Sequence, residues 1–290
     1  MRFTSAIALA ITITLWGCSY SLAKIGFGEI PPLNMAFLRA ALSLPLLIPV
    51  AYYINPDIKR VLKNWKVLLI LGFYGAVAYQ VLQNYGLTMT SASESSVLLN
   101  SDPIFIALLA SLYLKEKLSP RQWAGIAMSF AGVSIIVLQG EVGSLSLTPM
   151  NVLGDILAVG GAFAWALFSV YGKKLMAKVN AYDLTAYSAL FGAMILAPFA
   201  LGVEGLTLPS TMNGWGILLF LGIGSSGLAY LLWFVALHGV SAYEAGISLF
   251  FTPMIAIMMA TMFFGEHIDL LFGIGAAVTI LGMLITTRRK

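Results

Sequence analysis

Residues 92–132 read ASESSVLLNSDPIFIALLASLYLKEKLSPRQWAGIAMSFAG, and residues 242–282 read AYEAGISLFFTPMIAIMMATMFFGEHIDLLFGIGAAVTILG. Sliding the sequence by 150 positions superposes the two stretches, and eleven of the fifty residues from 88 to 137 are then identical. Two apolar stretches share some residues by chance, but they do not share polar and proline positions together. The aligned pairs include Glu94 with Glu244, Pro103 with Pro253, Glu116 with Glu266, Gly125 with Gly275 and Gly132 with Gly282. The sequence therefore predicts an internal duplication.

The composition indicates an integral membrane protein. Of the 290 residues, 60% are hydrophobic and only 10% are charged, against roughly 45–50% and about 25% in an average soluble domain. This small number of charges cannot cover a water-exposed surface, and the surface must therefore face lipid. The single cysteine, Cys18, excludes a disulfide framework and a cysteine-rich metal site.

Long apolar stretches recur along the whole chain, each of a length that crosses about 30 Å of hydrocarbon as a helix. Only helices satisfy every backbone group within one segment, and short alternating barrel strands are absent from the pattern. We therefore predict an all-α integral membrane protein. The ten expected transmembrane helices span residues 4–26, 33–54, 66–87, 94–114, 121–139, 152–173, 182–203, 213–236, 244–264 and 269–287.

The duplication divides these helices into two repeats, residues 1–145 with helices 1–5 and residues 146–290 with helices 6–10. Five is an odd number, so the second copy enters the membrane in the opposite direction, as in the inverted repeats of secondary transporters. The first helix loosely resembles a lipoprotein leader around Leu15-Trp16-Gly17-Cys18. Trp16 fits such a cleavage box poorly, and an offset of 149 pairs it with Trp165, so we interpret this segment as the first span.

Basic residues predict the orientation, because Lys and Arg accumulate in cytoplasmic loops. With the amino terminus inside, 14 of the 16 basic residues lie on the cytoplasmic side, and the exceptions are Lys24 and Arg39. Both termini are then cytoplasmic, in the cell membrane of a prokaryote (its inner or plasma membrane). Basic groups scattered along one face fit this rule better than nucleic-acid binding, and no nucleic-acid partner is expected.

The pattern shared by the two halves resembles the EamA repeat of the drug/metabolite transporter superfamily. It consists of an Ala-x-Glu, a proline nine residues later, a Glu thirteen residues further on, and two glycines seven apart. Arg39, after Pro31-Pro32, matches a position common in the first repeat of that family, whereas Ser188 in the second half departs from it. The resemblance covers essentially the whole chain. It implies a ten-helix exporter with a central cavity for a small molecule, and the family includes exporters of amino acids, other metabolites and drugs.

Among the charged residues of the predicted spans we single out four, because a charge within a membrane is costly unless it is paired or hydrated: Lys24, Arg39, Glu94 and Asp102. Glu94, Ser101 and Asp102 share one face of helix 4. Arg39 can pair with Asp102 or Glu94 at similar depth. Thr252 replaces Asp102 in the second repeat. We hypothesise an ion pair that closes an outer gate or a carboxylate that couples transport to protons; the alternative is a static pair that fixes helix packing.

Aromatic and amide side chains near mid-membrane complete the candidate cavity, and Glu244 is added as the repeat copy of Glu94. The aromatic and amide candidates are Trp16, Tyr20, Tyr79, Gln80, Gln83, Asn100, Trp165, Tyr230 and Trp233. Trp16 and Trp165 can offer flat faces to an organic substrate or simply pack.

Two further sets of residues suggest moving and fixed parts. Pro103 and Pro253, expected near the middle of helices 4 and 9, are candidate hinges, although proline kinks also shape packing. The paired glycines are expected to allow close helix packing.

The residue inventory argues against an enzyme or a primary pump. The two histidines form no HExxH motif, and the sequence holds no Walker motif. We expect no metal and no cofactor. The sequence thus favours a secondary transporter that exports amino acids or similar polar solutes, or drugs, by alternating access. A passive facilitator or channel of the same fold, and more distantly a membrane-embedded enzyme, are the alternatives. Protons are the candidate coupling ion, and the expected oligomeric state is a monomer or weak dimer.

Overall fold

The computed structural model describes residues 3–89, 98–138, 149–256, 258 and 270–287. Within these ranges the chain is almost entirely helical and contains no strand. Seven helical runs are long and apolar enough to cross a membrane. They are Phe3–Gly26, Pro32–Ile54, Trp65–Met89, Val152–Leu175, Ala181–Glu204, Met212–Gly239 and Leu270–Thr287. The predicted all-helical, multi-span membrane protein is confirmed to this extent.

Several of these runs are single helices. They are α1 (Phe3–Gly26), α2 (Pro32–Ile54), α9 (Pro149–Leu175) and α15 (Leu270–Thr287), and α10 (Ala181–Phe199) continues into the π-helical η2 (Ala200–Glu204). Two runs are interrupted: α4 (Trp65–Gly72), η1 (Phe73–Ala78) and α5 (Tyr79–Met89) form one, and α11 (Met212–Leu219), η3 (Phe220–Leu228) and α12 (Ala229–Gly239) form the other. Both η1 and η3 are π-helical, a geometry often found at functional sites.

The predicted spans 94–114, 121–139 and 244–264 are not among these seven. The first contains α7 (Asp102–Tyr113), the second α8 (Pro120–Leu138), and the third α13 (Ala242–Ser248) followed by the 3-10 turn η4 (Leu249–Phe251). The 12 residues of α7 are about 18 Å long, too short to cross the bilayer alone. As membrane spans, these three segments stay predictions.

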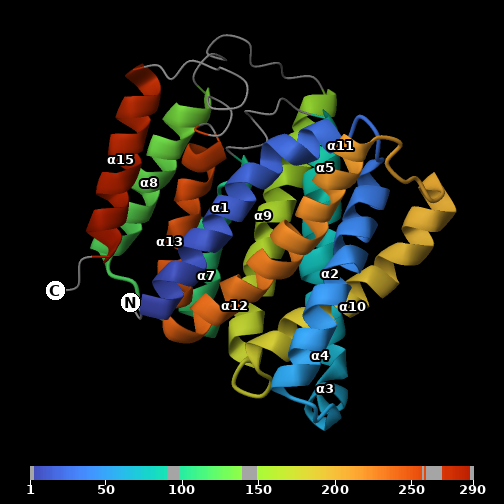
Figure 1. The fold of residues 1–290 in the computed structure, drawn as a ribbon. Helices are drawn as coiled ribbons and strands as arrows, with labels where there is room; N and C mark the ends of the chain where they lie inside the picture. Colours follow the sequence, from blue (N-terminus) through green and yellow to red (C-terminus); the bar gives the residue numbers. More distant parts are fainter. Residues whose placement is uncertain (1–2, 90–97, 139–148, 257, 259–269, 288–290) are drawn as a thin grey trace.

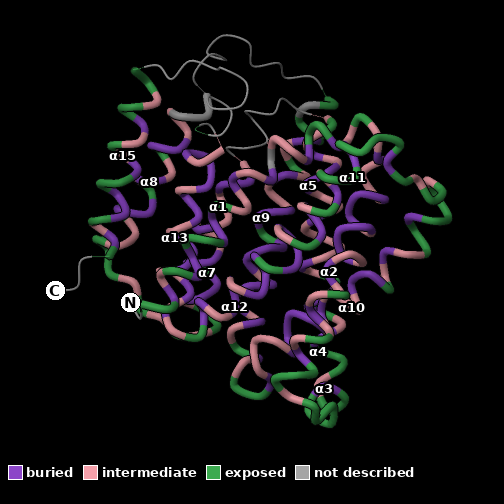
Figure 2. Tube along the Cα trace, in the orientation of Figure 1, coloured by how far each residue is buried: buried purple, intermediate pink, exposed green. Residues whose placement is uncertain are grey.

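The arrangement places the start of α1 and the end of α15 at the same face of the molecule (Figure 1). The short basic helix α3 (Lys59–Lys63) and the end of α9, which carries Lys173 and Lys174, lie toward that face as well. Buried residues line the inward sides of the helices, and exposed residues lie at the periphery (Figure 2). Many exposed residues are large and apolar, including Ile7, Phe199 and Leu281, as a lipid-facing surface requires.

The proline positions correct one expectation. Pro103 does not lie in the middle of a helix: residues 100–101 form a turn, and Pro103 occupies the first turn of α7. Pro253 likewise follows η4 and lies at the start of the helical residues 252–256. Proline suits the first turn of a helix because its missing N–H would have no partner there. The expected kinks are therefore breaks that precede the two prolines.

The packed pair α2 and α10 is tied by amide–carboxylate hydrogen bonds at both ends. At one end Asn34 donates from Nδ2 to Glu204 Oε2 over 3.0 Å, and at the other end Asn55 donates from Nδ2 to Asp183 Oδ2 over 2.8 Å. An offset of 149 relates Asn34 to Asp183 and Asn55 to Glu204. The two hydrogen bonds therefore join repeat-equivalent positions, and the amide of one pair stands where the other pair has its carboxylate.

The π-helical segments are stabilised in a matching way. The Trp16 indole Nε1 donates to the Ser225 carbonyl in η3 over 3.0 Å, and the Tyr230 hydroxyl donates to the Gly75 carbonyl in η1 over 3.4 Å. Gly75 and Ser225 are 150 residues apart. A π-helical segment displaces carbonyls from the regular ladder, so an aromatic donor that reaches one of them stabilises the interruption.

The paired glycines bring α8 and α15 into close backbone contact, as expected. A Cβ atom on Gly125 would lie 2.6 Å from the Gly282 carbonyl oxygen, and one on Gly132 would lie 2.7 Å from the Gly275 carbonyl oxygen. Ser129 Oγ donates to the Thr279 carbonyl between them, over 3.1 Å. These contacts require glycine, because any side chain would push the two helices apart.

Substituting Gly132→Ala should destabilise the protein by about 1–3 kcal/mol, the usual cost of overpacking a tight interface. Gly273→Ala on α15 is the matched control, because a Cβ there meets nothing within 4 Å. Reversible unfolding in detergent measures both. Equal stability of the two variants would contradict the proposed role of the glycine contact.

Candidate functional site

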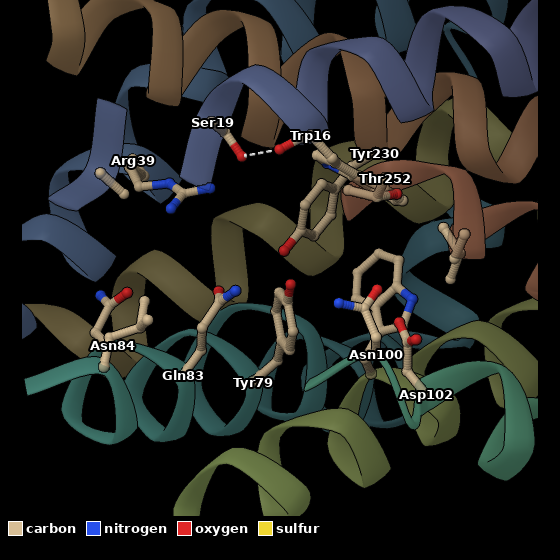
Figure 3. A pocket seen from close by; sticks show the side chains of 14 residues that line it. Trp16, Ser19, Arg39, Tyr79, Gln83, Asn84, Asn100, Asp102, Tyr230 and Thr252 are labelled. Atoms are coloured by element: carbon tan, nitrogen blue, oxygen red, sulfur yellow. Dashed lines mark hydrogen bonds between the residues drawn. The ribbon is translucent and has the colours of Figure 1, made fainter. Parts of the chain in front are cut away.

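A cavity lies among helices of both halves of the chain (Figure 3). At one end Ala23 and Leu87 lie within a turn of the ends of α1 and α5, at the face opposite the chain termini. The cavity is lined by Trp16, Ser19, Ala23, Arg39, Tyr79, Gln83, Asn84, Leu87, Asn100, Asp102, Trp165, Tyr230, Leu249 and Thr252.

The sequence anticipated eight of these residues: Trp16, Arg39, Tyr79, Gln83, Asn100, Asp102, Trp165 and Tyr230. It missed Ser19, Asn84 and Thr252 among the polar lining. Asn84 follows Gln80 and Gln83 on the same helix, and Thr252 is the repeat partner of Asp102. Helical spacing and the repeat offset were therefore the signals that could have found them.

An aromatic cluster forms one wall. The rings of Trp16 and Trp165, the residues paired by the repeat, meet edge to face with centroids 5.0 Å apart. Tyr230 lies 5.1 Å from Trp165, and Tyr79 lies 5.1 Å from it on another side. Trp165 is 2% exposed, so this wall is a packed core as well as a cavity surface. Such edge-to-face packing holds the ring orientations.

Arg39 lies at one end of the cavity and is 5% exposed. Its Nε donates to Ser226 Oγ over 3.1 Å, and its Nη2 donates to Ser225 Oγ over 3.3 Å, both from η3. These two hydroxyl groups orient the guanidinium group at this end of the cavity.

Asp102 lies at the opposite end of the view, beside Asn100, with Gln83 and Tyr79 between it and Arg39 (Figure 3). The predicted ion pair between Arg39 and Asp102 does not form: Asp102 Oδ1 is buried without a hydrogen-bond partner. The reason is that η3 directs the arginine, whereas the break before α7 sets the carboxylate against a different wall. The alternative partner of Arg39, Glu94, lies outside the described residues.

A polar layer separates this cavity from a second one. Gln80 Nε2 donates to the Tyr230 hydroxyl over 3.3 Å and to Ser226 Oγ over 3.5 Å. Gln80 and Tyr230 are themselves 150 residues apart. Gln80 lines only the second cavity of the two, together with Ser188, the repeat counterpart of Arg39. The two cavities therefore differ in charge.

The remaining candidates lie elsewhere. Lys24 is exposed at the end of α1, and Ser101 donates its hydroxyl to the Leu98 carbonyl just outside the cavity lining. Trp233 is fully buried behind Trp165 and donates to Ser169 Oγ over 3.1 Å. Glu244 does not reach the cavity: it forms a capping box with Ser241 at the start of α13. A carboxylate in the first helical turn satisfies backbone donors there. The Tyr20 side chain is outside the described part of the structure.

Glu116 is the centre of a network that joins the two halves on the side of the chain termini. Its carboxylate accepts the backbone N–H groups of Ala242 and Tyr243 and pairs with Lys173 over 3.0 Å. Lys173 Nζ also donates to the Val240 carbonyl over 2.6 Å. Glu116 thus caps α13, a helix of the other half of the chain. We refer to these five residues as the Glu116 network.

Comparison with protein families identifies one match that covers nearly the whole chain. The model of the "EamA-like transporter family" matches residues 4–138 and again residues 152–288. A solved crystal structure with 20% sequence identity superposes with a TM-score of 0.85 and covers 99% of this chain and 98% of that one. The fold therefore recurs in a protein of low sequence identity.

Similar curated proteins are named transporters. An "Uncharacterized transporter" of Archaeoglobus fulgidus is 32% identical over 292 residues, covering 100% of this chain and 99% of its own. The "Uncharacterized transporter YetK" of Bacillus subtilis is 27% identical, covering 98% and 87%. A "Probable terminal-alkyne amino-acid exporter" of Streptantibioticus cattleyicolor is 24% identical, covering 100% and 95%.

Replacing Lys173→Gln should cost about 1–2 kcal/mol of stability, because a shorter neutral side chain leaves Glu116 and the Val240 carbonyl without their charged donor. Lys174→Gln changes the net charge equally at an exposed neighbouring position and should change stability little. Reversible unfolding of the purified variants compares them. A loss of the same size in both would show that the ion pair is not the cause.

Proposed function

Because this chain belongs to the EamA-like transporter family, we propose that it is a secondary transporter that exports small organic metabolites, with amino acids as the leading substrate class. The family and the names of the relatives indicate a transporter and not an enzyme. The observation that carries the substrate class is the cavity itself. It combines a hydroxyl-held arginine, a buried carboxylate, amides and aromatic faces, groups that suit a zwitterionic or moderately polar solute.

The mechanism that we propose is alternating access between two inverted five-helix repeats, residues 1–145 and 146–290. Support comes from reciprocal contacts between positions about 150 apart, at the two ends of the α2–α10 pair and at the α8–α15 glycines. The π-helical segments η1 and η3 also contain positions that are 150 apart, Gly75 and Ser225. An approximate two-fold axis relates positions in this way. A repeat that rocks against its partner would open the cavity to each face in turn.

Orientation follows from charge placement. The face that carries α3 and the end of α9 is the basic one, and we assign it to the cytoplasm, with both termini. The cavity reaches toward the opposite face, whereas the Glu116 network holds the two halves together near the basic face. This conformation therefore corresponds to an outward-facing state of a protein in a prokaryotic cell membrane. A monomer contains the complete cavity.

Proton coupling is the proposed energy source. Asp102 is a carboxylate with one buried, unpaired oxygen, and Glu94, outside the described residues, is the other candidate. A passive facilitator of the same fold is the second candidate function. Flux in proteoliposomes separates the two, because only a coupled transporter accumulates substrate against its gradient when a pH difference is imposed. Downhill flux without accumulation at any pH difference would establish the facilitator.

Removing the Arg39 charge should weaken amino-acid transport, because a charge-assisted hydrogen bond to a carboxylate contributes about 1.5–3 kcal/mol. Counterflow of radiolabelled amino acids into proteoliposomes should show a half-saturation concentration raised about tenfold or more for Arg39→Gln. Arg60→Gln, which removes a charge from α3 outside the cavity lining, is the matched control. Unchanged counterflow in Arg39→Gln would remove Arg39 from the binding site.

A further inference from the structure

The repeat gives each contact between the two halves a counterpart, because an offset of 149 or 150 relates every position to one in the other half. If the halves exchange conformations when the cavity changes sides, a contact between two positions is replaced by the contact between their counterparts. A contact whose counterpart is already present can therefore persist in both states. A contact that exists at one face only has to break. The repeat thus separates stationary contacts from moving ones.

The α2–α10 pair belongs to the stationary class. The counterpart of the hydrogen bond between Asn34 and Glu204 is the one between Asn55 and Asp183, and both are present. An exchange of conformations converts each bond into the other. The two helices can therefore stay together while the halves move.

The α8–α15 pair and the centre of the molecule are stationary for a second reason. Ser129 and Thr279 are 150 residues apart, and each donates its hydroxyl to the carbonyl of the other, over 3.1 and 3.5 Å. Gln80 and Tyr230, also 150 apart, are hydrogen-bonded over 3.3 Å. A contact between counterparts is its own counterpart, so it lies near the approximate two-fold axis. An exchange of conformations leaves it unchanged.

The Glu116 network behaves differently. Lys173 is 19% exposed and pairs with Glu116 over 3.0 Å. Its counterpart, Lys24, is exposed at the end of α1, at the face opposite the chain termini. The two lysines are chemically identical, so the difference in their surroundings arises from conformation. Glu266, the counterpart of Glu116, lies outside the described residues.

The contacts of Glu116 are of a kind that can break at a membrane surface. Its carboxylate accepts the N–H groups of Ala242 and Tyr243, which lie in the first turn of α13 and have no intrahelical acceptor. Water can satisfy those groups and Lys173 when the carboxylate leaves. Glu116 belongs to the first half and all its partners to the second, so this one side chain joins the two halves here.

The turn that presents Glu116 is strained. Lys115 has a φ of 56°, in the left-handed region that residues other than glycine rarely adopt. Its counterpart in the sequence is Gly265. The next N–H group, that of Glu116, donates to the Ala110 carbonyl at the end of α7 over 3.2 Å. Strained backbone persists where surrounding contacts hold it, and it is frequent in segments that switch between two arrangements.

Resting on the alternating access proposed above, we propose that the Glu116 network is the cytoplasmic gate of the transporter. Glu116 separates from Lys173 and from the start of α13 when the cavity opens to the cytoplasm. The α2–α10 pair, the α8–α15 pair and the central Gln80–Tyr230 contact stay intact in both states. The Lys173 ion pair therefore sets the balance between the closed and the open gate.

The accessibility of a buried thiol tests this gate. Cys18 is the only cysteine of the sequence, so Cys18→Ser gives a cysteine-free background. In that background, Ala242→Cys places a thiol at the fully buried residue that Glu116 caps. Ala186→Cys is the matched control, because Ala186 is equally buried on α10, in the cluster that packs against α2.

A membrane-impermeant thiol reagent, added to inside-out membrane vesicles that hold the full-length protein, reaches the cytoplasmic face. It should label Ala242→Cys about tenfold faster when Lys173→Gln is also present, because loss of the ion pair favours the open gate. Lys174→Gln removes the same charge at an exposed neighbouring position and should leave this rate unchanged. Ala186→Cys should stay unlabelled with either lysine variant.

Three results would overturn the gate. The first is an unchanged labelling rate of Ala242→Cys in the presence of Lys173→Gln. The second is an equal rise at Ala186→Cys, because a general loss of packing exposes both positions. The third is labelling of Ala242→Cys from the outer side only, in right-side-out vesicles. Counterflow of amino acids by the unchanged protein tests the transporter function separately: counterflow together with any of these results leaves a transporter without this gate, and absence of counterflow contradicts the transporter function itself.

Discussion

Inside a bilayer, every backbone N–H and C=O group must find its partner within the protein, and uninterrupted helices meet this demand most simply. In this chain the regular α-helix is interrupted at four places next to the cavity: at η1, at η3, before Asp102 and before Thr252. At the π-helical segments the solution is visible, since Trp16 and Tyr230 donate to carbonyls in η3 and η1. The same two aromatic residues form a wall of the cavity. The stability of the interruptions and the shape of the site thus depend on one another.

Away from the cavity, the two halves behave as equivalent parts. The α2–α10 pair uses one amide–carboxylate bond at each end, and the α8–α15 pair uses the same glycine spacing on both helices. Such contacts make each pair a stiff unit. If one repeat rocks against the other, movement is then confined to the connections between these units, among them the Glu116 network.

Within the cavity the equivalence ends. Arg39 corresponds to Ser188 and Asp102 to Thr252, so the charges belong to the first half only. Burying an arginine and a carboxylate in a membrane protein is expensive, and a pair that neutralised both would lower the cost. Arg39 and Asp102 do not pair with each other: Arg39 donates to two serine hydroxyls of η3, and Asp102 Oδ1 has no partner within the described structure. A cost that packing alone does not require is typical of a site that meets its partner in a ligand.

Length, hydropathy and the repeat offset were enough to predict the helical membrane class, the bounds of seven spans and the pairing of Trp16 with Trp165. These are properties of segments, and they do not depend on how the segments are arranged in space. The sequence also singled out Arg39, Asp102, Gln83 and Asn100, which line one cavity in the structure. Only the tertiary structure decided that Arg39 faces η3 and not Asp102, that Glu244 caps a helix, and that Thr252 and Asn84 complete the lining. These outcomes depend on where a helix is interrupted and how it is rotated about its axis. A π-helical segment, or a break before a proline, changes how the rest of the helix is rotated. The size of that change depends on the side chains that pack against the segment, and those side chains come from residues far away in the chain.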